Sequence, residues 1–380
     1  MKDMGKLQYF LGIQATFHDQ GLFLGQQRYA EDLLSVAGML DCTPLPTPLP
    51  VQLHKVPKQD EVFSDPTYFR KLAGKLQYLT LTRPDIQFAV NYVCQKMHAP
   101  TTSDYNLLKR ILRYVKGTTT MGLTFNRQTD FRLRAYSDSD HAGCQETRRS
   151  TGGFCTFLGN NIISWSSKKQ PTVAKSSTEA EYRSLSDTTS EIVWMENLLK
   201  EIRISQPQPP ELYGDNLSSI YLAANPVLHT RSKHFQTHYH FVRERVALGS
   251  LVVYHIPAHL QLADIFTKPL PYAAFSSLRY KLGVDVPPTQ SLQGSIRENH
   301  KTEQGEVLGL LAQPKNKAQT EKPIKPTQQL ITKDKGIDGV KQGHNVAVAK
   351  GTKLQERTMT QLETKNRFNV LSLLPNSVNA

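Results

Sequence analysis

The N-terminal third of the chain has a mostly helical pattern of apolar positions. Residues 6–25 form two short alternating stretches joined at Gln20-Gly21, which predicts a pair of strands. Residues 43–64 are rich in proline and polar side chains, as expected of a connector. Elsewhere apolar residues recur every three or four positions, and this spacing predicts amphipathic helices in residues 28–40, 65–97 and 102–118.

The pattern changes at residue 131. Phe131, Leu133 and Ala135 alternate with polar residues, which predicts a half-buried strand, and the next apolar stretch predicts a hairpin turning at Gly159-Asn160-Asn161. The remaining elements follow in this order: helix 177–202, strand 211–215, helices, strand 250–258, and a last helix opened by residues 262–270. Three neighbouring strands followed by strands with crossover helices predict an α/β fold with a mixed five-stranded sheet and flanking helices.

The chain is basic, with 46 Lys and Arg against 33 Asp and Glu and a net charge of +13. This excess favours a polyanionic partner, nucleic acid first, although a basic but otherwise ordinary protein would show the same balance. Much of the charge lies in residues 291–380, whose net charge is +6 and whose one aromatic residue is Phe368. A segment of that composition cannot build a core, so we expect the tail to be disordered.

The four cysteines are scattered and include no C-x-x-C pair, which favours free thiols over a disulfide framework or a zinc ribbon. The opening residues MKDMGKLQYF lack the apolar centre of a signal peptide, and no segment is long and apolar enough to span a membrane. We therefore expect no membrane partner and an intracellular, cytoplasmic location.

Four carboxylates occupy positions where sites form in α/β sheets. Asp138 ends the first strand of the second region, Glu181 lies near the start of the long helix, Asp215 ends a later strand, and Asp264 begins the last helix. Strand ends and helix starts gather along one edge of such a sheet. Converging carboxylates would repel one another unless cations held them, and oxygen ligands without a His/Cys cluster favour Mg²⁺ or Mn²⁺ over zinc.

Each carboxylate also has an ordinary structural explanation. Glu181 follows Thr178 by three residues and could complete a capping box. Asp215 could be a turn or N-cap residue, and Asp264 could complement the helix macrodipole. Taken singly, each explanation is at least as good as a metal site; the joint occurrence in this strand–helix order favours the site.

The region AYSDSDHAGCQETRRSTGGFCTFLGNNIISWSSKKQPTVAKSSTEAEYRSL closely resembles the ribonuclease H (RNase H) domain of copia-type (Ty1/copia) retrotransposon Pol polyproteins. The stretches LYGDNLSSIYLAANPVLHTRSKH, HFVRERVALG and LADIFTKPL continue the resemblance in order. Upstream, GKLQYFLGIQ, KLAGKLQYLTLTRPDIQFAVN and LKRILRYVKGT resemble the end of the same polyprotein's reverse transcriptase. The resemblance implies a mostly helical thumb and connection remnant in residues 1–126, an RNase H-like domain in residues 131–284, and an unmatched basic tail in residues 285–380.

The resemblance also implies an activity and a site. The family's catalytic set carries over onto Asp138, Glu181, Asp215 and Asp264, which would hold two Mg²⁺ ions, or Mn²⁺, and hydrolyse the RNA strand of an RNA–DNA hybrid. The implied partners are the hybrid and the upstream reverse transcriptase, and the implied setting is a virus-like particle. His259 resembles the mobile auxiliary histidine of retroviral RNases H, although a surface-loop histidine is the alternative.

Two features limit these expectations. A reverse transcriptase needs a Tyr-x-Asp-Asp motif, and this chain contains no Asp-Asp dipeptide, so we expect no polymerase active site. Gln236 and His238 stand where the family commonly has acidic residues.

The predicted helix 102–118 carries four basic residues that form either a solvated face or a phosphate-binding one: Lys109, Arg110, Arg113 and Lys116.

Two other functions compete with an active ribonuclease. One is a catalytically inactive nucleic-acid-binding relic of the polyprotein. The other is a transposase or integrase of the same broad fold, but that class ends its acidic triad with glutamate, whereas Glu181 comes second here. The intact carboxylate set favours the nuclease.

Overall fold

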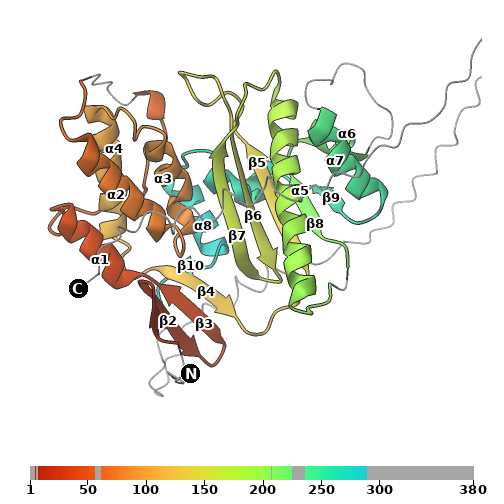
Figure 1. Cartoon of the computed structure of the whole chain (residues 1–380), viewed down its shortest axis with the longest axis horizontal. Coiled ribbons are helices and arrows are strands. Elements are labelled where there is room, and N and C mark those ends of the chain that lie inside the picture. The colour runs from red at the N-terminus through yellow and green to blue at the C-terminus, as the bar shows by residue number, and fades with distance from the viewer. Residues whose placement is uncertain (1–4, 6, 56–60, 207, 225–235, 289–380) are drawn as a thin grey trace, which may run out of the picture. The chain divides into compact units, whose positions relative to one another are not determined.

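Two five-stranded sheets organise the chain, and Figure 1 shows helices packed on each of them. The computed structural model describes residues 5, 7–55, 61–206, 208–224 and 236–288. Those residues fall within one compact unit, Met1–Ile296. The predicted basic tail, residues 285–380, lies outside the described residues from residue 289 onward, as does the segment 225–235.

The first sheet is antiparallel throughout, in the order β1-β2-β3-β4-β10. Its strands are β1 (Tyr9–Phe10), β2 (Ile13–His18), β3 (Gly21–Gly25), β4 (Gly122–Asn126) and β10 (Val284–Asp285). The predicted hairpin corresponds to β2 and β3, whereas β4 and β10 are strands that the pattern analysis does not predict. The last strand, β10, comes from near the C-terminal end of the described residues and pairs Val284 with Leu123.

Helices and short 3₁₀ turns accompany the first sheet: α1 (Gln27–Val36), η1 (Leu53–Lys55), α2 (Pro66–Leu79), η2 (Pro84–Ile86), α3 (Gln87–Cys94) and α4 (Thr102–Lys116). The predicted inward face of α4 is confirmed, because Leu108, Ile111 and Leu112 are fully buried. The helix begins with a capping box in which the Thr101 hydroxyl accepts the Asp104 N–H while the Asp104 carboxylate accepts the Thr101 N–H.

The second sheet has the order β7-β6-β5-β8-β9. Its strands are β5 (Leu133–Ser139), β6 (Thr151–Leu158), β7 (Asn161–Lys169), β8 (Glu211–Gly214) and β9 (Val252–His255). Strands β5, β6 and β7 are antiparallel neighbours, whereas β8 and β9 run parallel to β5. This is the predicted mixed sheet, and its strand order and directions are those of an RNase H-like fold.

The helices that accompany the second sheet are α5 (Ser177–Glu201), α6 (Leu217–Ala224), α7 (Gln236–Ala247) and α8 (Tyr272–Lys281), with 3₁₀ helices η4 (Ala258–Leu260) and η5 (Leu262–Phe266). One prediction here is wrong. The sequence predicts that residues 262–270 open the last helix, but the structure has the short η5 and a break before α8. Pro269 and Pro271 explain the break, since the residue before a proline is disfavoured in helical conformation.

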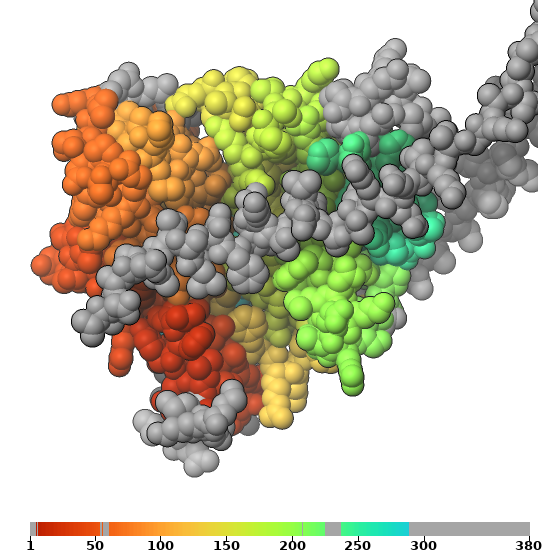
Figure 2. Space-filling model, viewed as in Figure 1, coloured from red at the N-terminus to blue at the C-terminus, as the bar shows by residue number. Residues whose placement is uncertain are grey.

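The second sheet is covered on both faces. On one face Leu133 and Ala135 of β5 pack in a core with Tyr182 and Leu185 of α5. On the other, residues such as Tyr136 belong to a core that continues through η5 and α8 into the helices of the first sheet. In Figure 2 the orange residues of the first region adjoin the yellow-green residues of β6 and β7, and Asn91 Nδ2 of α3 lies 3.5 Å from Ser167 Oγ of β7. The two predicted regions, residues 1–126 and 131–284, thus pack against each other within one compact unit. That each folds separately stays a prediction.

Within the described part of the chain, no helix combines the length and the apolar character needed to cross a bilayer.

Candidate metal centre

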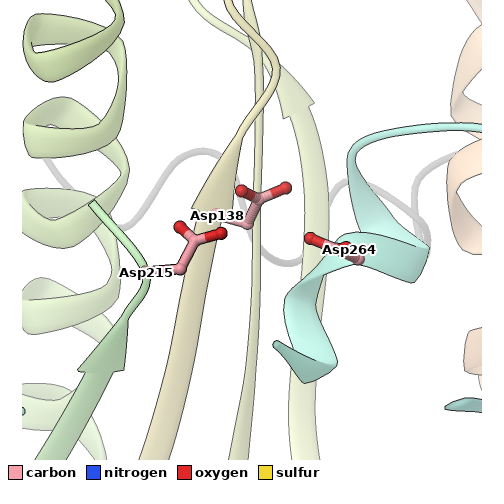
Figure 3. A group of neighbouring side chains, drawn as sticks. All are labelled: Asp138, Asp215 and Asp264. Carbon is pink, nitrogen blue, oxygen red and sulfur yellow. The ribbon is translucent and has the colours of Figure 1, made fainter. Parts of the chain in front are cut away.

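Three aspartates from three separate elements meet at one edge of the second sheet. Asp138 comes from β5, Asp215 follows β8, and Asp264 lies in η5, with an oxygen of each within 4.8 Å of the others (Figure 3). Asp138 is buried, and the other two are half-buried. The sheet therefore gathers three of the four predicted carboxylates into one cluster.

The pairing of β5 with β8 explains why the first two aspartates meet. The strands are parallel, and Tyr136 lies opposite Tyr213. Asp138 and Asp215 each come two residues after that pair, so they leave the sheet at the same level and the same edge. The neighbouring rings of Tyr136 and Tyr213 stack with centroids 5.0 Å apart, which supports the register below the site.

A glycine allows the third aspartate to approach. Gly153 of β6 pairs directly with Asp138, and a Cβ on it would lie 2.7 Å from Phe266 Cβ and 2.8 Å from Thr267 Cγ2. Without that Cβ, η5 packs onto the sheet. Two hydrogen bonds then hold the segment: the Thr267 hydroxyl donates to Asp138 Oδ2, and Gln261 Nε2 donates to the Ser137 carbonyl at 2.9 Å.

Glu181 stands beside the three aspartates rather than within their close group. Burial and, after it, the charges of Asp138 and Asp215 raise its pKa to about 9, although the Ser139 N–H donates a hydrogen bond to it. The predicted alternative, a capping box with Thr178, is wrong. The helix cap is Ser176, whose hydroxyl accepts the Glu179 N–H at 3.1 Å, so the Glu181 carboxyl has no capping role.

The alternative interpretation of Asp215 as the N-cap of the next helix is also wrong. Asn216 caps α6, since its Oδ1 accepts the Ser219 N–H at 3.0 Å. Burial raises the pKa of Asp215, and the Asp138 charge adds to this. Asp264 does lie in the first turn of η5, but its carboxylate faces the cluster: burial and Asp138 raise its pKa to about 7 against the opposing effect of Lys268.

Lys268 brings a positive charge to the cluster. Its Nζ lies 2.8 Å from Asp264 Oδ1 and 3.6 Å from Asp138 Oδ2. Although burial opposes its charge, these carboxylates raise the pKa of Lys268 to about 12. Sequence reasoning does not single out Lys268, Thr267 or Gly153; the available signal is that Thr267 and Lys268 follow Asp264 by three and four residues.

Asp140, the neighbour of Asp138, is held away from the close group. Its Oδ1 accepts the Thr151 N–H, and its pKa is raised to about 6, chiefly by burial. Of the two neighbours, Asp138, which the resemblance predicts as a site residue, is thus the one that joins the cluster.

The less specific predictions stay untested. His259 lies exposed in η4, and among the described residues it makes no hydrogen bond or ion pair with the three aspartates. On α4, Arg110 donates to Thr47 Oγ1 at 3.0 Å and Arg113 donates to the Thr43 carbonyl at 2.7 Å. These bonds tie the connector to the helix, and contact between α4 and phosphates remains a prediction.

The donors fit a hard divalent cation. Every side chain in the cluster offers carboxylate oxygens, which Mg²⁺ and Mn²⁺ prefer. Burial and, after it, the charge of Asp138 raise the pKa values of Glu181 and Asp264. Without a metal ion, such a site is expected to show repulsion among its carboxylates, which a bound cation would offset.

The chain resembles long polyproteins over most of its length. It is 46% identical over 290 residues to the Retrovirus-related Pol polyprotein from transposon RE2 of Arabidopsis thaliana, covering 76% of this chain and 20% of that protein. It is 33% identical over 293 residues to the corresponding polyprotein from transposon TNT 1-94 of Nicotiana tabacum, covering 75% and 22%. The chain thus spans about a fifth of the length of these relatives. No protein-family model matches it.

A shorter relative is the Uncharacterized mitochondrial protein AtMg00810 of Arabidopsis thaliana, 58% identical over 194 residues, covering 51% of this chain and 80% of that protein. Among solved structures, the N-terminal RNase H domain of Rv2228c from Mycobacterium tuberculosis matches with a TM-score of 0.28 at 12% identity, covering 40% of this chain and 98% of that one. The foamy viral protease-reverse transcriptase matches with a TM-score of 0.33 at 12% identity, covering 64% and 45%. Scores this low add nothing to the strand order described above.

Proposed function

Because the chain belongs to the retrovirus-related Pol polyproteins of copia-type transposons and carries their RNase H-like domain, we propose that it hydrolyses the RNA strand of RNA–DNA hybrids. The observation that supports this proposal most is the meeting of Asp138, Asp215 and Asp264 at the sheet edge. These residues come from distant parts of the chain, so a structural role for each alone does not account for their convergence.

In this proposal Asp138, Glu181, Asp215 and Asp264 hold two divalent cations, Mg²⁺ or Mn²⁺. Bound there, the ions supply an activated water and a stabilised leaving oxygen for phosphodiester hydrolysis. Asp138 is the central ligand because it is the most buried of the three clustered aspartates and is oriented by the Thr267 hydroxyl. With a pKa raised to about 9, Glu181 would hold a proton at neutral pH without a cation and would give it up on binding one.

We further propose that the first sheet and its helices, which resemble the end of a reverse transcriptase, help to hold the hybrid. The upstream part of the polyprotein would then be a partner in the same work. The chain itself carries no Asp-Asp pair, so the proposed activity is cleavage without synthesis.

The test is a gel assay of the purified chain on an end-labelled RNA–DNA hybrid with Mg²⁺. We expect cleavage of the RNA strand that EDTA abolishes, with double-stranded DNA left intact. Asp138→Asn provides the inactive control. Tight binding of the hybrid by the wild-type protein without any cleavage would replace this function with that of a nucleic-acid-binding relic.

A further inference from the structure

Lys268 is in direct contact with the carboxylate cluster. Its ammonium contacts two aspartates on different elements, at 2.8 Å from Asp264 Oδ1 and 3.6 Å from Asp138 Oδ2. These are the two residues that η5 and β5 bring together. The positive charge of the lysine thus lies between the carboxylates of β5 and η5, where a bound metal ion would otherwise balance their charge.

The surrounding charge is strongly one-sided. Five carboxyl groups experience the positive charge of Lys268: Asp138, Asp140, Glu181, Asp215 and Asp264. From the other elements, His255 faces Asp215 and His141 faces Asp140. Lys268 is therefore the principal cation shared by the whole group within the described structure.

The attachment of Lys268 leaves it free to move. Its side chain is 41% exposed, whereas that of Asp138 is 3% exposed. The adjacent Thr267 is fully buried and bonded to Asp138, which anchors the backbone at this point. A lysine on such an anchor can turn its flexible four-carbon stem into solvent without disturbing η5.

We propose that Lys268 is a resident counter-cation of the carboxylate cluster, bridging Asp138 and Asp264 in the metal-free protein and giving way when a divalent cation binds. The inference rests on the proposed metal site but assigns a role that the site's ligands do not have. The positive charge of Lys268 offsets the repulsion among the carboxylates in the metal-free protein, and it competes with the metal for them. Its loss must therefore tighten metal binding while weakening the metal-free fold.

Metal affinity tests the first consequence. Full-length chain stripped with EDTA and then dialysed is titrated with Mn²⁺, and free Mn²⁺ is followed by electron paramagnetic resonance. We expect Lys268→Gln to bind Mn²⁺ roughly tenfold more tightly than wild type, since one competing positive charge is gone. Lys268→Arg keeps the charge and should stay closer to wild type.

Lys200→Gln is the matched control. Lys200 lies on α5 nineteen residues after Glu181, about 28 Å along the helix, and its loss changes the net charge equally. It should leave the Mn²⁺ affinity unchanged. Equal tightening in Lys200→Gln and Lys268→Gln would reduce the effect to overall charge and overturn the inference, as would unchanged or weaker binding in Lys268→Gln.

Melting in EDTA tests the second consequence without any metal. Lys268→Gln should lower the melting temperature in EDTA, and added Mn²⁺ should restore it by more than it raises that of the wild type. A higher melting temperature for Lys268→Gln in EDTA would overturn the inference while leaving the metal site intact. A wild-type protein that binds no Mn²⁺ would overturn the metal site and this inference together.

Discussion

Gly153 pairs directly with Asp138 across β5 and β6, and the space that its missing side chain leaves is filled by Phe266 and Thr267. The buried aspartate and the segment that carries Asp264 therefore approach each other through one glycine. The geometry of the candidate centre depends on this close approach as much as on the carboxylates themselves.

Gly153→Ala should damage the site more than the fold. The added Cβ would lie under 3 Å from Phe266 and Thr267, so η5 must shift away from β5. We expect the loss of the Thr267–Asp138 hydrogen bond, at least tenfold weaker Mn²⁺ binding, and a destabilisation of about 1–3 kcal/mol. Mn²⁺ titration and urea unfolding measure the two effects.

Gly152→Ala is the neighbouring control. A Cβ there would meet Ser184 Oγ at 3.3 Å and Ser184 Cβ at 3.6 Å, contacts that small adjustments accommodate. It should keep nearly all of the metal affinity. Similar losses in both variants would mean that β6 tolerates no side chain at either position and that η5 has no special dependence on Gly153.

Asp215→Asn should abolish Mg²⁺-dependent cleavage of the hybrid while leaving the protein equally or more stable in EDTA. Asparagine keeps a neutral oxygen but removes a charge that Asp138 and burial already disfavour. Hybrid binding should survive, because contacts to phosphates supply most of it. Cleavage assays and thermal melts in EDTA check both halves.

Glu201→Gln, at the exposed end of α5, removes a negative charge far from the centre and should change neither cleavage nor melting appreciably. Cleavage by Asp215→Asn at the wild-type rate would leave Asp215 as a simple strand-end residue.

Much of this centre is predictable from local patterns. Asp138 and Asp215 each follow a strand pattern, and the order of elements predicts parallel neighbours whose carboxyl ends share an edge. The position of Asp264 is predicted although its element is a 3₁₀ helix and not the expected α-helix. The reason is that an acidic residue in the first turn of an apolar segment is common to both kinds of helix. The correct sheet follows from the same periodicities.

The rest depends on tertiary structure that no local pattern contains. Strand β10 has two residues and a partner near position 123, so its own sequence has no alternation to detect. The contact of Lys268 with Asp138 joins residues far apart in the chain, and the need for Gly153 arises only when η5 lies on the sheet. Thr178 and Glu181 have capping-box spacing, yet Ser176 caps the helix.

Cys144 should be the most reactive of the three cysteines whose pKa is shifted. Burial opposes its ionisation, but hydrogen bonds from Lys169, at 2.8 Å, and from Thr147 outweigh it and lower the pKa of Cys144 to about 7. Burial raises the pKa of Cys94 to about 11 and that of Cys155 well above its usual value. We expect iodoacetamide to alkylate Cys144 first, with the rate rising as pH passes through about 7.

Peptide mass spectrometry at several pH values gives the rate for each thiol. Lys169→Met removes the donor and should move the midpoint for Cys144 upward. An unchanged midpoint in that variant would show that Lys169 does not activate the thiol.

Asp85→Ala should destabilise the protein by about 3–5 kcal/mol, because it leaves the fully buried Arg83 guanidinium without its carboxylate partner. The wild-type carboxylate accepts bonds from Arg83 Nε at 2.9 Å and Nη2 at 2.8 Å, and from the Tyr114 hydroxyl at 2.6 Å. Urea unfolding measures the loss.

Asp32→Ala is the comparison for this pair. Asp32 lies 2.8 Å from Lys75, but its side chain is 58% exposed, so removing it should cost about 0–1 kcal/mol. Equal losses in the two variants would contradict the importance of burial for the Arg83–Asp85 pair.

The chain should not extend a primer on an RNA or DNA template. Polymerisation in this family needs the Tyr-x-Asp-Asp motif, and no Asp-Asp pair occurs in these 380 residues. Incorporation of labelled nucleotides by the purified chain, next to a complete reverse transcriptase as positive control, checks this. Measurable incorporation would require a polymerase centre of another kind.

The return of β10 to β4 has a consequence during translation. The edge of β4 is complete only when Val284 has been made, about 160 residues after Leu123. At ribosomal speeds of about 5–20 residues per second, that edge waits roughly 10–30 s for its partner. An unpaired strand edge is a template for pairing with other chains. Nascent chains on the same messenger RNA would therefore be most prone to join one another in this interval, which lasts until after the strands of the second sheet have been made.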